Sequence, residues 1–268
     1  MKIALFQGPQ QGADPAIHLA VLAEVAARAH AQGARLLIAP ELFVTGYRIG
    51  DDTLRERAEP ADGAAAARVA EIARESGLAL LYGYPERDGE AIYNAAQLID
   101  RDGRRVANHR KTHLFGDTER HVFTAGDAPT VAELDGLRIG VLICYELEFP
   151  ENARLLALAG VDLIAVPTAL MHPYAAVART LVPARALENQ VFVAYANRCG
   201  SERDYDYVGA SCIVAPDGRE LARAGGSEAL LVAALDRDVL AESRRLNPYL
   251  HDRRPALYRG LAEASRRH

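Results

Sequence analysis

Short apolar runs alternate with longer helix-like segments along the first third of the chain. The apolar runs at residues 3–7, 35–39 and 78–81 have the length and composition of buried strands. Two helices are predicted between them. The first begins at Asp14-Pro15, an N-cap residue followed by proline at the first helical position, and ends at Gly33. The second covers residues 62–77, with Asp62 as its cap.

Hairpin signals then break this alternation. Asp102-Gly103 separates the runs 91–99 and 104–108, and Asp-Gly pairs recur at residues 135–136 and 217–218. Further strands are predicted at residues 137–143, 161–166 and 190–197, and further helices at 150–160 and 174–187. Strand–helix units mixed with hairpins predict sheets layered with helices rather than one wholly parallel sheet. Residues 1–268 contain no linker or repeat, which predicts a single domain.

Composition narrows the class of protein. Half of the 268 residues are hydrophobic, a quarter are charged and the net charge is only −5, which argues against disorder. No basic tract is present, so a nucleic-acid partner is not expected. The apolar stretches are far shorter than the roughly 20 residues of a membrane helix, and Gln7-Gly8-Pro9 interrupts the first one too early for a signal peptide. We therefore expect a soluble, cytoplasmic protein.

The C-terminal tail is rich in arginine. The tail, from about residue 240 to 268, contains Arg244, Arg245, Arg253 and Arg254, and we expect it to be exposed or to pack on a partner subunit.

The three cysteines form no CxxC pair and are odd in number, which indicates reduced thiols rather than a disulfide framework.

Cys144 is the candidate nucleophile among the three cysteines. It follows an apolar strand and precedes a helix that begins at Pro150, so it occupies a strand-to-helix elbow. Main-chain N–H groups at such an elbow can face a developing oxyanion. The alternative is a buried, inert cysteine, and this is the interpretation we favour for Cys199 and Cys212, which lack the elbow.

Three charged residues are candidates to assist the thiol. Glu41 ends the second buried strand, at the rim where layered sheets bind ligands, although a solvated loop position is the alternative. Lys111 ends the cluster His109-Arg110-Lys111, which alone would indicate a charged edge strand. Glu119 lies between Asp117 and Arg120, where surface ion pairing is the simplest interpretation.

The histidines give no metal signal. His109, His113 and His121 have spacings that fit no common zinc pattern, so no metal is expected. His109 or His113 as the base of a Cys–His hydrolase stays an alternative to a carboxylate base.

Taken together in chain order, these segments resemble the nitrilase, or carbon–nitrogen hydrolase, superfamily. The resemblance covers nearly the whole chain and is closest to aliphatic amidases that act on ω-amino amides and to stereoselective amidases. The segments that carry it are Met1-Lys2-Ile3-Ala4, Pro40-Glu41 to Tyr47, Tyr82-Gly83-Tyr84-Pro85-Glu86, Ile92-Tyr93-Asn94, Arg110-Lys111-Thr112-His113-Leu114-Phe115, Cys144-Tyr145-Glu146, Phe149-Pro150-Glu151 and Arg185-Ala186-Leu187-Glu188-Asn189.

The resemblance implies an α+β fold, the four-layer α-β-β-α sandwich, and a set of catalytic roles. It implies Glu41 as general base, Lys111 as catalytic cation, Cys144 as nucleophile and Glu119 as a second glutamate. No metal or organic cofactor is implied. Glu146 departs from the family pattern, because amidase-like members usually have aspartate after Cys-Tyr.

The implied activity is hydrolysis of a small aliphatic amide, such as 5-aminovaleramide, to carboxylate and ammonia through a cysteine thioester. N-carbamoyl amine hydrolysis, nitrile hydrolysis and a silent binding domain are the alternatives. The residues expected to contact the substrate are Tyr47, Phe115, Tyr145, Glu146 and Ala169, within a wall that includes residues 168–174. Glu146 or Glu148 is a candidate to bind a substrate ammonium, and the alternative is a charge at a helix start that the helix dipole favours. The resemblance also implies a homodimer or a larger homo-oligomer that pairs through helical faces.

Overall fold

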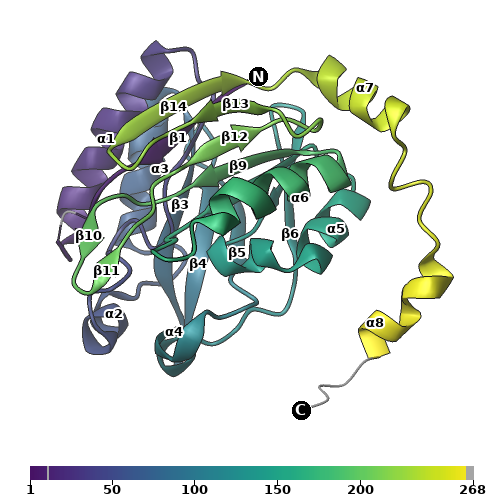
Figure 1. Ribbon diagram of the computed structural model, residues 1–268. Coiled ribbons are helices and arrows are strands. Elements are labelled where there is room, and N and C mark those ends of the chain that lie inside the picture. The colour runs from purple at the N-terminus through teal and green to yellow at the C-terminus, as the bar shows by residue number, and fades with distance from the viewer. Residues whose placement is uncertain (11, 264–268) are drawn as a thin grey trace.

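Two mixed β-sheets form the centre of the protein (Figure 1). The computed structural model describes residues 1–10 and 12–263. The strands of the first sheet, in spatial order, are β14 (Ala229–Ala234), β1 (Lys2–Gln7), β2 (Leu36–Ile38), β3 (Ala79–Asp88), β4 (Ala91–Ile99) and β5 (Arg105–Arg110). Those of the second sheet are β13 (Glu220–Arg223), β12 (Cys212–Val214), β9 (Phe192–Ala196), β8 (Leu163–Pro167), β7 (Leu137–Val141) and β6 (Thr130–Leu134).

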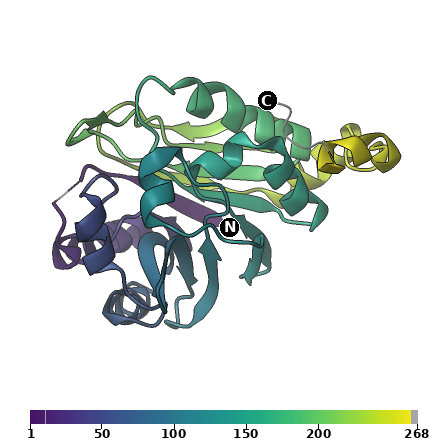
Figure 2. The same cartoon turned by 90° about the horizontal axis from the view of Figure 1, so that it is seen from below.

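Helices cover the outer face of each sheet (Figures 1 and 2). Helices α1 (Pro15–Ala31) and α3 (Ala64–Ser76) pack on the first sheet, and α5 (Pro150–Leu158) and α6 (Val182–Asn189) pack on the second. The remaining elements are α2 (Asp51–Arg57), α4 (Gly116–Val122), α7 (Arg237–Leu246), α8 (Arg259–Glu263), the 3₁₀ turns η1 (Cys144–Glu148) and η3 (Pro255–Tyr258), the π turn η2 (Val177–Leu181), and a small hairpin of β10 (Ser201–Glu202) and β11 (Tyr205–Asp206).

The hydrophobic core is divided into layers by the two sheets. Ile3 and Leu5 of β1 pack between the sheets, whereas the alternate residues Ala4 and Phe6 pack against the helices. Both faces of the strand are thus buried, which is why the sequence reads as a continuous apolar run. The order helix, sheet, sheet, helix confirms the predicted four-layer α-β-β-α sandwich.

The parallel strands of both sheets direct their carboxyl ends toward one place. Strands β1, β2 and β3 are parallel, as are β7, β8 and β9. The two sheets meet there, because the main-chain N–H of Glu41, after β2, donates to the carbonyl of Thr168, after β8, at 3.3 Å. Open α/β sheets bind ligands at such carboxyl ends, and Cys144 lies shortly after the carboxyl end of β7.

Two predicted helices begin later than expected. Helix α3 begins at Ala64, with Gly63 rather than Asp62 at its N-cap position. The helix predicted at residues 174–187 is a π turn followed by α6, which carries a proline in its first turn. Proline has no N–H to continue an α-helical ladder, which accounts for the irregular turn before it. Helices α2 and α4 were absent from the prediction because they are only two turns long.

The tail predicted from about residue 240 has two parts. Its first part, α7, packs on its own chain: Leu240 is buried, and Arg244 Nη2 donates to the Val161 carbonyl at 2.9 Å. After α7, an arm that carries η3 and α8 leaves the body (Figures 1 and 2). Within the described residues, no helix combines the length and the apolarity that a membrane span requires.

Candidate active site

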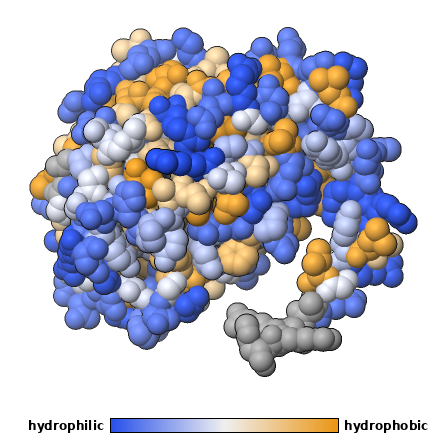
Figure 3. All heavy atoms as spheres, viewed as in Figure 1, coloured by the Kyte–Doolittle hydropathy of each residue, from blue (hydrophilic) through white to orange (hydrophobic). Residues whose placement is uncertain are grey.

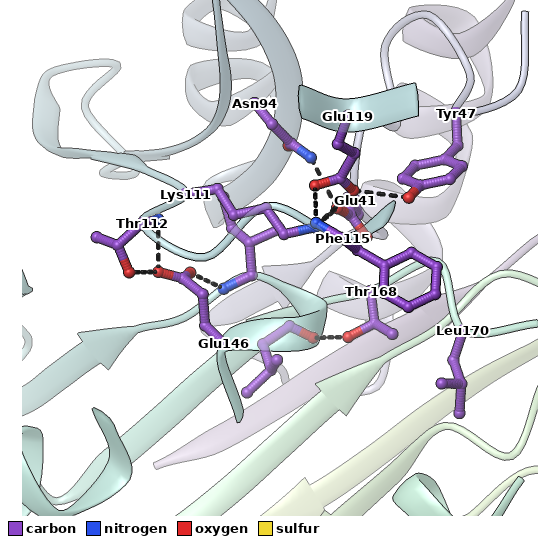
Figure 4. Close-up of polar contacts among 12 residues, drawn as sticks. Glu41, Tyr47, Asn94, Lys111, Thr112, Phe115, Glu119, Glu146, Thr168 and Leu170 are labelled. Carbon is purple, nitrogen blue, oxygen red and sulfur yellow. Dashed lines mark hydrogen bonds and ion pairs between the residues drawn. The ribbon is translucent and has the colours of Figure 1, made fainter. Parts of the chain in front are cut away.

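A buried lysine joins two glutamates at the meeting point of the sheets (Figure 4). Lys111 follows β5 and is fully buried, and its Nζ donates to Glu41 Oε1 at 2.6 Å and to Glu119 Oε1 at 2.7 Å. Burial alone would lower the pKa of Lys111, but Glu119 and Glu41 together raise it well above its usual range. The ammonium therefore stays protonated, and the predicted alternative of a solvated edge position does not apply to Lys111.

The two carboxylate oxygens of Glu41 differ in their hydrogen bonds. Its Oε1 also accepts from Asn94 Nδ2 at 2.7 Å, whereas Oε2 is buried and has no hydrogen-bond partner among the described residues. Burial raises the pKa of Glu41, the charge of Lys111 opposes that rise and the charge of Glu119 adds to it. A carboxylate that has a raised pKa and an oxygen without a hydrogen-bond partner can accept a proton.

Glu119 fixes the cluster to the surrounding loops. Its Oε1 accepts from the Tyr47 hydroxyl at 2.6 Å, and its Oε2 accepts from the Phe115 N–H at 2.8 Å. Arg120, one residue on, pairs with Asp117 at the surface instead. Sequence reasoning alone gave Glu119 the surface pairing that its neighbours have, whereas the resemblance placed it in the site.

Cys144 is the first residue of η1 and has a left-handed main-chain conformation. Its φ of 47° lies in a region that residues other than glycine rarely adopt. Burial raises the pKa of the Cys144 thiol well above its usual range and the charge of Glu41 adds to this, while Lys111 and the Ala169 N–H oppose it. The thiol is therefore protonated at rest and needs a base to become a nucleophile.

A cavity of about 270 Å³ opens onto Cys144. It is lined by Tyr47, Phe115, Cys144, Tyr145, Glu148, Ala169, Leu170, Met171 and Tyr174. Four of the five predicted substrate-contacting residues thus line it, together with much of the predicted wall at residues 168–174.

Glu146, the fifth, does not line the cavity, which corrects that expectation. It is buried behind the nucleophile, where Oε2 accepts from the Ile143 N–H at 2.6 Å and Oε1 accepts from the Thr112 N–H at 2.8 Å. Its Oε2 also lies 2.9 Å from His109 Nε2. Glu146 therefore joins the residue after Lys111 to the residue before Cys144.

The other candidates lie outside the cavity. His109 contacts Glu146, and His113 stacks on Phe149 with ring centroids 4.2 Å apart, so neither is placed as the base of a Cys–His pair. Cys199 and Cys212 are buried free thiols. Residues 1–10 and 12–263 hold no group of three or more histidine, cysteine, aspartate or glutamate side chains that could bind a metal ion.

Sequence reasoning alone missed two residues that hold the turn formed by Glu41 and Leu42, called here the Glu41 turn. Arg198 is buried, and its Nη2 donates to the carbonyls of Glu41 at 2.9 Å and Leu42 at 2.8 Å. These two hydrogen bonds hold Leu42 at a φ of 46°. Gly83 of β3 lies directly against the same turn. Only the position of Gly83 in the Tyr82-Gly83-Tyr84 motif gave a signal for it.

Comparison with known proteins assigns the family. The carbon–nitrogen hydrolase family profile matches residues 2–245. The chain belongs to this family. A Pseudomonas protegens protein described as a hydrolase in the pqqF 5′ region is 54% identical, over 98% of this chain and 92% of its own length. An (R)-stereoselective amidase from Pseudomonas sp. is 37% identical, over 95% of this chain and 92% of its own.

A solved carbon–nitrogen hydrolase has the same fold. The amidase from Nesterenkonia sp. AN1 matches with a TM-score of 0.85 and 36% identity, over 97% of this chain and 99% of that chain, and a glutamate-to-glutamine variant of it carries acrylamide at the active site cysteine. The present chain is an amidase of the nitrilase superfamily, and Cys144 is its catalytic cysteine. The resemblance predicted from the sequence is confirmed.

The Gly83→Ala substitution is expected to disable this amidase while leaving it folded. The added Cβ would lie 2.4 Å from the Leu42 nitrogen and 2.9 Å from Glu41 Cα, so the Glu41 turn must shift. A misplacement of this kind costs on the order of 10²-fold in rate. Amide turnover and circular dichroism measure the two effects. Gly225→Ala is the control, because no atom lies within 4 Å of its added Cβ; a fully active Gly83→Ala protein would contradict this prediction.

The Glu146→Gln substitution is expected to destabilise the fold in a pH-dependent way. Burial would raise the pKa of Glu146, but His109 and Thr112 hold it below its usual range. Its ionised form therefore stabilises the fold fully above the ordinary carboxyl pKa of about 4.3, and this is lost as the pH falls further. Urea unfolding should show a deficit of about 1–3 kcal/mol at pH 7 that shrinks below about pH 4.

The exposed Glu90 provides the control for this measurement, since Glu90→Gln removes the same charge from a surface turn. Its free energy of unfolding should match that of the unaltered protein across the pH range. A deficit of Glu146→Gln that is the same at pH 7 and at the acid end would refute a stabilising ionised Glu146.

Proposed function

We propose that this amidase hydrolyses small linear aliphatic amides, ω-amino amides such as 5-aminovaleramide among them, to a carboxylate and ammonia. The observation that carries the proposal is the buried group at the cavity: Cys144, the protonated Lys111, and Glu41 with one open oxygen. This group supplies a nucleophile, a cation and a base beside one cavity.

The first chemical step forms a thioester. Glu41 Oε2 takes the thiol proton as the sulfur of Cys144 attacks the amide carbon. Lys111 and the Tyr145 N–H hold the oxyanion, and the loss of one such donor typically costs about 3 kcal/mol of barrier. The protonated Glu41 then gives its proton to the departing amide nitrogen, and ammonia leaves.

The second step releases the acid. Glu41 takes a proton from a water molecule, which attacks the thioester carbon. The C–S bond then breaks, Glu41 returns the proton to the sulfur of Cys144, and the acid that is released ionises to the carboxylate. Glu119 fixes Lys111 during both steps and orients the amide nitrogen in the first. The bond of Lys111 to Glu119 and the bond of Tyr47 to the same oxygen support this role.

The size of the cavity supports a short linear substrate. Its volume of about 270 Å³ lies just below the range of roughly 300–1,000 Å³ that is usual for sites of drug-sized ligands. The related Nesterenkonia amidase has been solved in complex with butyramide, a four-carbon amide. An extended chain of four or five carbons is the substrate that this volume suits.

A substrate panel tests the proposal. We expect ammonia release from butyramide and 5-aminovaleramide, none from Cys144→Ala, and a loss on the order of 10²–10⁴-fold for Glu41→Gln, because general-base catalysis is worth that much. Cys199→Ala, which alters a buried cysteine outside the cavity, is the matched control and should stay active. Turnover of nitriles or N-carbamoyl amines alone, or activity in Cys144→Ala, would overturn the proposal.

We also propose that the chain forms a homodimer or a larger homo-oligomer through α5, α6 and the C-terminal arm. Leu155 and Leu158 of α5 and Leu187 of α6 are exposed apolar side chains on adjoining helices. The arm adds exposed Leu257 and Leu261, and Figure 3 shows apolar side chains on its surface. A second copy would cover these surfaces.

Light scattering after size-exclusion chromatography tests this association. We expect a mass at least twice that of one chain, and we expect Leu155→Asp combined with Leu158→Asp to lower it, because a buried charge opposes an apolar interface. Ile17→Asp, on the exposed face of α1, is the control. A monomeric unaltered protein would refute the proposed assembly.

A further inference from the structure

Glu148 is the one charged residue among those that line the cavity. The lining includes no lysine, arginine or histidine within residues 1–10 and 12–263. The Glu148 side chain is half-buried at the end of η1, and its carboxylate has neither a hydrogen bond nor an ion pair in that part of the chain. The carboxylate oxygens of Glu148 are therefore free to accept hydrogen bonds from a ligand.

Arg185 holds the main chain of Glu148 without neutralising its carboxylate. The guanidinium donates to the Leu147 carbonyl at 3.0 Å and to the Glu148 carbonyl at 2.7 Å. Its remaining nitrogen pairs with Glu188 at 3.1 Å. These bonds fix the end of η1, so the position of Glu148 is set before any substrate binds.

The electrostatic state of Glu148 favours a cation beside it. Burial raises the pKa of Glu148, and the charges of Lys111 and Arg185 oppose that rise only in part. Lys111 is itself already paired with Glu41 and Glu119. A bound cation would therefore restore the stabilisation that burial removes from the carboxylate.

The rest of the lining suits a methylene chain that ends in a cation. Phe115 lies with its ring centroid 5.3 Å from that of Tyr145 and 5.9 Å from that of Tyr174. Aromatic faces attract ammonium groups as well as covering apolar chains. Leu170 and Met171 complete the apolar wall.

We propose that Glu148 is a specificity-determining residue, which binds the ammonium group of an ω-amino amide while the amide group lies at Cys144. The inference rests on the proposed amide hydrolysis and adds to it the residue that selects a cationic substrate. Among residues 1–10 and 12–263, no other carboxylate lines the cavity wall. Glu146 is enclosed behind Cys144, and Glu41 and Glu119 bind Lys111.

The test compares two amides of the same size. In hexanamide, a methyl group replaces the ammonium of 5-aminovaleramide. We expect the unaltered enzyme to prefer 5-aminovaleramide in kcat/KM, mainly through KM, and Glu148→Gln to reduce that preference by about tenfold or more, the usual worth of a hydrogen bond to a charged group. Glu148→Lys should instead favour the monoamide of glutaric acid, whose far end is an anion.

Glu151→Gln is the matched control, because it removes the same charge from an exposed position three residues away. Its preference should equal that of the unaltered enzyme. An unchanged preference in Glu148→Gln, or an equal loss on both amides, would overturn the inference.

Binding separates failure of this inference from failure of the proposed function. Calorimetry with Cys144→Ala, alone and combined with Glu148→Gln, measures affinity for both amides without turnover. Tighter binding of 5-aminovaleramide that disappears with Glu148→Gln supports the inference even where no amide is hydrolysed. Equal affinities in the two backgrounds overturn it even where hydrolysis is observed.

Discussion

The active site depends on the burial of one ammonium between two carboxylates. Moving an unpaired lysine out of water is so costly that Lys111 can be fully buried only because Glu41 and Glu119 share its charge. The three residues come from a strand end, a loop and a short helix. The pairing that sets the charge of the site therefore also holds these three segments together. Asn94 and Tyr47 extend the same network into the neighbouring elements.

The nucleophile comes from the other sheet, so its position relative to Lys111 needs a separate link. Glu146 provides it, because the residues it binds lie next to Lys111 on one side and next to Cys144 on the other. Glutamate is one methylene longer than the aspartate that is usual at this position, yet its carboxylate is buried and bound by the Ile143 and Thr112 N–H groups away from the cavity lining. The departure from the family pattern thus concerns how the two sheets are joined, and it does not place a new group in the substrate cavity.

Strands β1 to β5 and β7 to β9, and Cys144, were predictable because their signals are local. An apolar run bounded by turn residues indicates a buried strand, and the elbow before Pro150 follows from neighbouring residues. The roles of Glu41, Lys111 and Glu119 depended on the resemblance, since each alone also fits a surface position. Arg198 gave no signal, because its partners lie 156 and 157 positions away along the chain. Contacts of that separation are set by sheet packing rather than by local pattern.

The distribution of charge also bears on how the product leaves under the proposed mechanism. The two carboxylates of Glu41 and Glu119 outweigh the one positive charge of Lys111, and Glu148 adds a further negative charge on the cavity wall, so the site is net negative. An amide group is neutral and meets no repulsion at Cys144. Hydrolysis converts it into a carboxylate beside Glu41, where like charges oppose each other in a medium of low dielectric constant. Under that mechanism the negative site accepts a neutral or cationic amide and disfavours the carboxylate that it forms, which favours product release.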